Sequence, residues 1–230
     1  MRAVLVMIFA LIAADALALG ETRPKMRPVY EPVVLPENAA LIRPQHRAEA
    51  LPRARWKHLR GSDVWTRTLA ASLKDHGASL PQSVPTDIGA WCPAYVENGP
   101  ERRRAFWIGL ISALAKHEST YRPYVSGDSG LSHGILQIRT GTAKLYGCRA
   151  RTRAQLLDPT ENLACAIKIM SKTVARDNAV SRKANGRRGG PGADWGPFVQ
   201  RAKREDMRAY VRRQDYCVPI SNIRPRLLPA

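Results

Sequence analysis

The sequence predicts a mainly α-helical domain over residues 62–218. Two apolar stripes with helical spacing support this prediction. The first consists of Trp107, Ile111, Leu114 and Glu118, and the second of Leu163, Ala166, Ile167, Met170 and Val174. Alternating apolar and polar residues, which are typical of strands, are scarce. The 230 residues have room for one domain of ordinary size plus extensions.

Residues 1–18 have the features of a secretory signal peptide. Arg2 precedes an apolar run over residues 3–13, and Ala16 and Ala18 supply the small residues expected before a cleavage site near Ala18. The run is too short to cross a bilayer comfortably. We therefore expect an exported, periplasmic or cell-wall-associated protein with no transmembrane span after cleavage. An uncleaved membrane anchor is the alternative.

Residues 19–61 are rich in proline and arginine and have little apolar periodicity. Because proline removes backbone donors and favours extended chain, we expect a disordered arm here. Residues 219–230 are expected to form a flexible tail.

The first helix of the domain is expected to begin after Ser62, a good N-cap residue, and to stop at Gly77. Its buried face would carry Trp65, Leu69 and Leu73. Residues 80–93 contain three prolines and are expected to form a loop.

Further helix signals lie in the second half of the chain. The helix that ends at Glu118 should follow Gly99-Pro100, and a short helix over residues 140–146 should close at Gly147. Asp158-Pro159-Thr160-Glu161 combines a cap, a first-turn proline and an acidic third position, which strongly predicts a helix start. Residues 184–192 are expected to form a loop. A last helix, from about residue 195 to 213, should bury Trp195, Phe198, Val199, Ala202 and Tyr210.

The four cysteines suit an exported protein. An even number in a secreted chain favours disulfides over metal, and no Cys-x-x-Cys pair suggests zinc. Three pairings are possible, of which we favour Cys148–Cys165 together with Cys92–Cys217. The second bond would tie the beginning of the domain to its end. We expect no metal and no cofactor.

Glu118 is the strongest catalytic candidate. A carboxyl among apolar neighbours loses hydration of its charged form, so its pKa should rise. The partial negative charge of a helix C-terminus acts in the same direction. Such a group can hold a proton near neutral pH and give it to a leaving oxygen. A partly exposed surface glutamate is the alternative.

The residues after Glu118 resemble the central motif of the soluble lytic transglycosylase family, in the lysozyme-like superfamily. In that family a Glu-Ser pair ending a buried helix is followed by an aromatic residue, a turn with proline, a Gly/Ser-rich loop and Gly-Leu-Met-Gln. The matching residues here are Glu118-Ser119, Tyr121, Pro123 and Gly134-Ile135-Leu136-Gln137. The resemblance covers roughly residues 111–138 and implies a lysozyme-like helical domain with a substrate cleft.

The resemblance also implies an activity. By analogy, Glu118 alone protonates the glycosidic oxygen between N-acetylmuramic acid and N-acetylglucosamine of peptidoglycan. It then acts as base on the muramyl 6-hydroxyl, which gives a 1,6-anhydro product. Asp128, the one acidic residue inside the motif loop, is expected to be a turn former. Among glycan-cleaving enzymes, the alternative is a muramidase-type hydrolase. Outside the enzymes, the alternative is a non-catalytic wall-binding protein.

Other site residues follow by position. Ser119 would orient the helix end, and Gln137 would line the cleft. Ser132 would contact sugar amides, with Ser129 as second choice because the loop is one residue longer than the commonest version. Gly134 would let the loop approach a bound sugar. Tyr121 and Trp195 could wall the groove or belong to the core, and His133 is expected at the surface.

One segment departs from the family pattern. The family has Ala-Tyr-Asn-Ala-Gly downstream, whose tyrosine lies against the catalytic glutamate. Lys183-Ala184-Asn185-Gly186 keeps Asn185 but has Ala184 where the tyrosine is expected. Tyr210 or Trp195 could fill that space.

The formal charge of +18, from 37 Lys and Arg against 19 Asp and Glu, predicts attraction to a polyanion. For an exported protein, we expect the peptide stems of the wall or an anionic membrane surface. Nucleic acid is not expected, because the basic runs lack interleaved aromatic residues.

Overall fold

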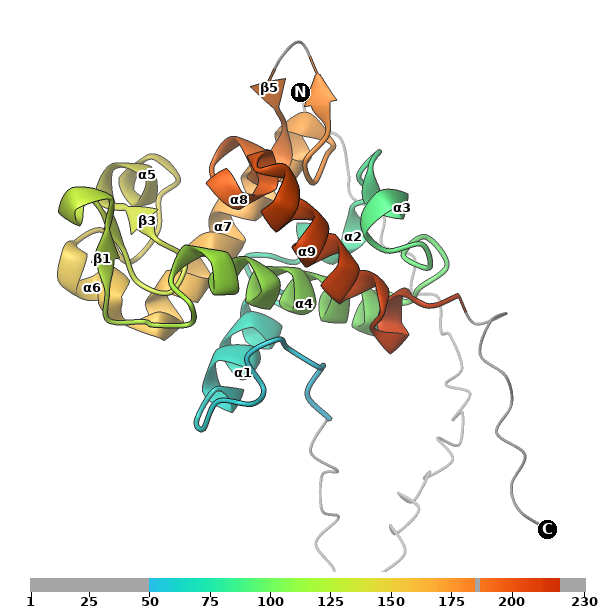
Figure 1. The fold of residues 1–230 in the computed structure, drawn as a ribbon, viewed down its shortest axis with the longest axis horizontal. Coiled ribbons are helices and arrows are strands. Elements are labelled where there is room, and N and C mark those ends of the chain that lie inside the picture. The colour runs from blue at the N-terminus through green and yellow to red at the C-terminus, as the bar shows by residue number, and fades with distance from the viewer. Residues whose placement is uncertain (1–49, 185–186, 220–230) are drawn as a thin grey trace, which may run out of the picture. The chain divides into compact units, whose positions relative to one another are not determined.

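The computed structural model describes residues 50–184 and 187–219. The predicted signal peptide, the predicted arm up to residue 49, Asn185 and the tail from residue 220 lie outside the described residues. The described chain is mainly helical with two small antiparallel sheets, which confirms the predicted fold class (Figure 1).

The helices are α1 (Asp63–Ser72), α2 (Ser79–Gln82), α3 (Ile88–Trp91), α4 (Pro100–Glu118), α5 (Thr140–Leu145), α6 (Arg153–Leu157), α7 (Pro159–Asp177), α8 (Gly196–Val199) and α9 (Arg201–Arg212). Short 3-10 turns are η2 (Asp128–Gly130), η3 (Gly190–Ala193) and η4 (Asp215–Cys217). The first sheet has the order β1 (Ser126–Gly127), β2 (Ser132–His133) and β3 (Ile138–Arg139), and the second pairs β4 (Lys183–Ala184) with β5 (Arg187–Arg188).

Helix α4 is the centre of the fold. It begins after Gly99 with Pro100 in its first turn, as predicted, and every residue from Ala105 to Ala115 is buried. A helix that is apolar on all sides is suited to such a position. Helices α1, α2 and α9 pack against it, and Figure 1 shows α9 crossing α4 on the side opposite to α1. Turn η4 packs against α4 as well, and Gly109 allows this contact, because a Cβ there would overlap the hydroxyl of Tyr216.

Helix α7 forms as its sequence signals predict. The Asp158 side chain accepts hydrogen bonds from the backbone N–H groups of Thr160 and Glu161, which satisfies two donors at the helix start. The predicted stripe is buried against α1 and α2. The helix ends at Asn178, whose φ of 45° places it in the left-handed region that favours a helix stop.

Three predictions about helices are wrong. Helix α1 ends at Ser72, before the predicted stop at Gly77. Residues 80–93 are not only loop, because α2 and α3 lie partly or wholly within them. The last helix is interrupted at Gln200, which has extended backbone angles (φ −73°, ψ 117°) and separates α8 from α9. The interruption changes the helical phase, so Val199 and Ala202 are exposed instead of buried, while Trp195, Phe198 and Tyr210 are buried as predicted.

The folded domain begins earlier than the predicted boundary at Ser62. Ala54 and Trp56 are buried, and the Trp56 indole donates a hydrogen bond to the Thr66 hydroxyl at 3.0 Å. The backbone N–H of Arg55 donates to the Ser112 hydroxyl at 2.7 Å. The end of the segment that we assigned to the disordered arm is therefore part of the core.

Two disulfides close the domain, and they are the pairs predicted from the sequence. Cys92–Cys217 joins the segment before α4 to η4, and Cys148–Cys165 joins the segment after α5 to α7. None of the helices within residues 50–184 and 187–219 has the length and apolar character needed to cross a membrane.

Candidate active site

A cleft of about 400 Å³ lies at the C-terminal end of α4. Its walls come from the end of α4, the small sheet, α5, α7 and the turn before α8. The lining residues are Glu118, Gly127, Asp128, Ser132, Gln137, Ile138, Arg139, Thr142, Ile169, Asp194, Trp195 and Gly196. In Figure 1 the sheet and α5 lie beyond the end of α4, and α8 lies over the same end of that helix.

Glu118 is the last residue of α4 and is only partly exposed. Burial raises the pKa of its carboxyl group to about 7, and the nearby Lys203 ammonium opposes this rise. Among the described residues, no hydrogen-bond donor engages the Glu118 side chain. The Glu118 carboxyl group thus lines the cleft with a pKa near neutrality and with no hydrogen-bond donor from the described residues.

Ser119 holds the turn that follows Glu118. Its hydroxyl donates to the carbonyl of Ile135 at 2.9 Å and accepts from the N–H of Arg122 at 3.1 Å. Ser119 is buried and does not line the cleft. The structure therefore places it where it orients the end of α4, as expected, but away from a bound sugar.

The Gly134–Gln137 segment lies under the floor of the cleft, which it lines through Gln137. The Gln137 amide donates to the carbonyls of Val125 and Gly134 at 3.2 and 2.7 Å, which fixes its orientation. Gly134 has φ +77°, and a Cβ there would overlap the Leu156 carbonyl and the Asn162 amide. Glycine is needed at this position for packing against α6 and α7, and Gly134 itself does not line the cleft.

Ser132 and Ser129 were alternative sugar contacts, and the structure separates them. Ser132 lies on β2 and lines the cleft, whereas Ser129 is exposed in η2 with φ 54° and does not. Ser132 is therefore the serine that the fold brings to Glu118.

Residues 96–206 match the family model of the Transglycosylase SLT domain. This segment is a transglycosylase SLT domain. It spans α4, the cleft loop, α7 and the first half of α9, and so contains every lining residue of the cleft.

The SLT domain also resembles solved structures in fold. The wild-type form 2 of DslA (Bd0314) is 22% identical with a TM-score of 0.67, and the match covers 72% of this chain and 98% of that one. A glutamate-to-glutamine mutant of DslA is 24% identical with a TM-score of 0.66, and the match covers 72% and 97% of the two chains. These likenesses confirm the lysozyme-like fold. No curated protein matches the sequence of this chain.

Trp195 is the aromatic wall of the SLT-domain cleft. Its indole N–H donates to the Leu136 carbonyl at 2.9 Å, so the ring is fixed against the cleft floor. The residue is 5% exposed and belongs to both the core and the cleft lining. The sequence left open whether Trp195 walls the groove or belongs to the core, and in the structure it does both.

The sequence analysis missed Asp194, a second carboxylate of the cleft. The Tyr146 hydroxyl donates to its two carboxylate oxygens at 3.4 and 3.5 Å. Burial raises the pKa of Asp194, while Arg176 and Tyr146 act in the opposite direction. Asp128 also lines the cleft; like Asp194 it is exposed, and it forms an ion pair with Arg139. Arg139, Thr142 and Ile169 were missed too, because their distance from Glu118 in the chain hides their proximity.

Two expected neighbours of Glu118 lie elsewhere, and His133 also differs from its prediction. The Tyr121 ring packs edge-on against the rings of Trp56 and His58, with ring centroids 6.5 and 5.8 Å apart, and lies outside the cleft. Tyr210 donates to the Arg53 carbonyl at 3.3 Å and does not occupy the place of the missing family tyrosine. His133, expected at the surface, is buried, with its Nδ1 3.0 Å from the Ser126 hydroxyl. Asn185 lies outside the described residues.

Proposed function

We propose that this chain is a lytic transglycosylase that cleaves peptidoglycan between N-acetylmuramic acid and N-acetylglucosamine, with Glu118 as the single general acid and base. The SLT domain indicates an enzyme that cleaves glycan strands. The observation that carries the finer proposal is the raised pKa of Glu118, about 7, inside a cleft with no competing donor in the described chain.

The proposed reaction needs one carboxyl group in two protonation states. Protonated Glu118 gives its proton to the glycosidic oxygen as the bond from that oxygen to the muramyl C1 breaks. The resulting carboxylate then accepts the proton of the muramyl 6-hydroxyl, whose oxygen bonds to C1 and closes the 1,6-anhydro ring. The substrate's own N-acetyl oxygen can stabilise C1 between these steps. Glu118 ends protonated, and no water is consumed.

The lining residues suit a sugar polymer. Trp195 offers an apolar surface to a pyranose ring, and Ser132 and Gln137 offer a hydroxyl and an amide to its polar groups. Arg139 and Thr142 extend the polar lining toward α5. The residues in this list are proposed as the substrate-binding set, with Glu118 as the catalytic residue.

A muramidase-type hydrolysis is the second candidate, and Asp194 is the observation that favours it. Glycosidases that use water employ two carboxyl groups, one as acid and one as base or nucleophile. Asp194 lines the same cleft as Glu118 and could serve as the second group. Hydrolysis would leave reducing muramyl ends in place of anhydro ends.

The proposed site of action is outside the cytoplasm. Two disulfides are typical of an oxidising compartment, and peptidoglycan lies outside the cell membrane. We propose export by the N-terminal segment, residues 1–18, and release into the periplasm or cell wall.

Digestion of purified sacculi by the wild type and by Glu118→Gln tests the enzyme proposal. The glutamine keeps the shape of the carboxyl but cannot donate the proton, so a loss of about a thousandfold or more in digestion rate is expected. Mass spectrometry of the wild-type products should show 1,6-anhydro-muramyl ends. Equal slow digestion by both proteins, with binding retained, would instead indicate a non-catalytic wall-binding protein.

A further inference from the structure

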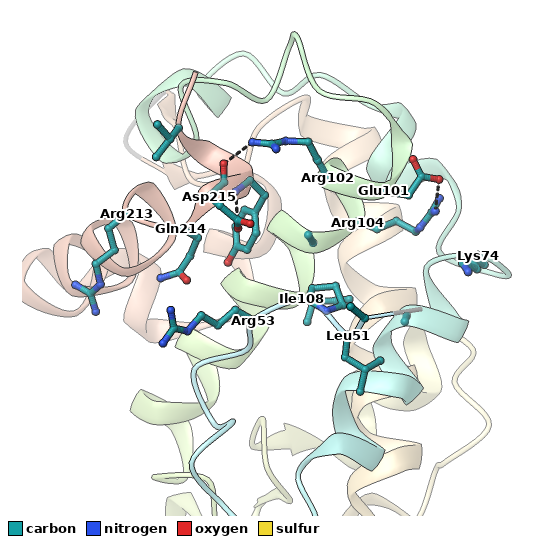
Figure 2. Close-up of a pocket in the computed structure, with 16 residues that line it drawn as sticks. Leu51, Arg53, Lys74, Glu101, Arg102, Arg104, Ile108, Arg213, Gln214 and Asp215 are labelled. Atoms are coloured by element: carbon teal, nitrogen blue, oxygen red, sulfur yellow. Dashed lines mark hydrogen bonds and ion pairs between the residues drawn. The ribbon is translucent and has the colours of Figure 1, made fainter. Parts of the chain in front are cut away.

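A second pocket, of about 700 Å³, lies beside the N-terminal half of α4 (Figure 2). Its walls come from residues 50–53, α1, α4 and residues 213–218 after α9. It shares no lining residue with the cleft. Ile108 of this pocket and Glu118 of the cleft are separated by ten residues of α4, or about 15 Å along the helix. None of the chemistry proposed for the cleft uses this pocket.

Uncompensated positive charge surrounds the pocket. Arg53, Arg102 and Arg213 form no ion pair with a carboxylate of the described chain. Arg102 donates instead to the Asn98 side chain at 2.8 Å and to the backbone carbonyl of Asp215. Because these partners are neutral, the Arg102 guanidinium is held in place while its charge stays available. An anionic ligand would be attracted to this ring of arginines.

The charged groups surround an apolar surface. Figure 2 shows Ile108 and Leu51 between two charged sides of the pocket, with Arg53 and Arg213 on one side and Arg104 on the other. Two carboxylates also line the pocket. Glu101 pairs with Arg104 at 3.0 Å, and Asp215 accepts the backbone N–H of Tyr216 at 2.8 Å. A matching ligand therefore carries carboxylates for the arginines, short aliphatic groups for the apolar surface, and an ammonium group for the two carboxylates.

We propose that this pocket binds the peptide stem of the wall polymer whose glycan is cut in the cleft, an inference that rests on the proposed function. A stem peptide combines carboxylates, small aliphatic side chains and the amine of a diamino acid, which are the three chemistries that the pocket offers. Phosphates of nucleic acid or of lipid headgroups match the arginines alone, and they carry no cation to place against Glu101 and Asp215.

The distance between the pocket and the cleft suits this ligand. An extended tetrapeptide spans about 13 Å, which is close to the separation of about 15 Å along α4. The pocket is therefore within reach only of a stem whose sugar lies on the pocket's side of the cleft. Binding there would hold the strand by a group that glycan cleavage leaves intact.

Calorimetric titration of the full chain with a synthetic stem tetrapeptide, alanyl-γ-glutamyl-diaminopimelyl-alanine, tests the site. The measurement uses Glu118→Gln as parent, so that cleavage plays no part. Adding Arg53→Gln and Arg213→Gln should raise the dissociation constant about tenfold or more, because two charge-assisted contacts are lost. These side chains are exposed, so the fold should tolerate the changes. The charge-matched control, Arg182→Gln with Arg187→Gln, removes two exposed arginines outside the pocket and should change binding less than about twofold.

A second measurement needs no substitution in the pocket. Titration of the isotope-labelled parent with the tetrapeptide should shift the methyl signals of Ile108 and Val218, while the methyl signals of Ile169 in the cleft stay in place. Equal binding by the pocket variant and the parent would overturn the site. An equal loss in the charge-matched control would do the same, since it would mean that only net charge matters. Arginine-dependent binding of phosphatidylglycerol vesicles without peptide binding would also reject the stem and identify a lipid site.

The failure of this inference is distinguishable from that of the proposed function. Wild-type digestion of sacculi without tetrapeptide binding rejects the stem site and leaves the transglycosylase proposal intact. Tetrapeptide binding at Ile108 and Val218 without digestion rejects the catalytic proposal and leaves a protein that binds wall peptides.

Discussion

Replacing Asn162 with alanine tests how the cleft floor is held in place. The Asn162 side chain is fully buried in α7 and makes three hydrogen bonds to the backbone. Its amide donates to the carbonyls of His133 at 2.9 Å and Leu156 at 2.8 Å, and its oxygen accepts from the N–H of Leu136 at 3.0 Å. The segment from residue 133 to 136 leads directly to Gln137 in the cleft.

The expected loss of stability follows from these contacts. Each hydrogen bond contributes about 1 kcal/mol net, so Asn162→Ala should lower the free energy of unfolding by roughly 3 kcal/mol. For a domain of this size, that corresponds to a fall of roughly 6–12 °C in Tm. Digestion of sacculi at 20 °C should also slow, because the floor that carries Gln137 is no longer tied to α7.

Ser112→Ala is the matched control. The Ser112 hydroxyl is also fully buried and bonds to two backbone groups, the N–H of Arg55 and the carbonyl of Gly109, each at 2.7 Å. It lies away from the cleft, so its loss should cost about 1–2 kcal/mol of stability and leave digestion at 20 °C unchanged. Thermal unfolding and digestion rates measure both effects. An unchanged Tm for Asn162→Ala, or an equal slowing of digestion by Ser112→Ala, would refute this reasoning.

Three further predictions concern charge and covalent bonds. Burial raises the pKa of Glu118 to about 7, so the folded state favours the neutral carboxyl group. The contribution of this neutral group to the free energy of unfolding is fully present below pH 4.5 and is lost as the pH rises through 7. Glu118→Gln should therefore be more stable than the wild type at pH 8, by at most about 3 kcal/mol, and this difference in unfolding free energy should vanish below pH 4.5. Urea unfolding at both pH values measures the difference, and a value that does not change with pH would contradict the prediction. Asp194→Asn should leave anhydro products in place if Glu118 acts alone, whereas a loss of cleavage together with reducing ends in the wild type would support hydrolysis. Replacing both Cys148 and Cys165 with serine should cost about 3 kcal/mol in unfolding free energy, and replacing both Cys92 and Cys217 should cost more, because that bond closes a longer loop; equal or negligible losses in urea unfolding would contradict this order.

The features that the sequence predicted well depend on local signals. The cap at Asp158 and the apolar stripe after it are read within one helix, and α7 forms accordingly. The position of Glu118 at the end of an apolar helix likewise predicts its raised pKa from its neighbours alone. The missed helix α6 had a local signal as well. Thr152 and Gln155 form a capping box, whose residue types and spacing are visible in the sequence.

The features that could not be predicted depend on contacts between distant segments. Trp56 belongs to the core because it meets Thr66 and Trp65, and a single tryptophan in a Pro/Arg-rich segment carries little periodic signal. Ser119 and Gly134 match the family motif but do not line the cleft. Ser119 hydrogen-bonds to the Ile135 carbonyl, and Gly134 packs against α6 and α7, so both stabilise the segment that leads to Gln137. Asp194 reaches the cleft only because the turn before α8 lies over the end of α4, an arrangement that residue spacing does not reveal.

The central claim is that the Glu118 carboxyl keeps its proton near neutral pH inside the cleft. Carbon-13 NMR titration of the glutamate side-chain carboxyl groups, with Glu118→Gln used to assign the signal, measures that pKa directly. The account predicts a midpoint near 7, above the ordinary value of 4.5. A midpoint near 4.5 would mean that the group is ionised at neutral pH and would contradict the proposed role as proton donor.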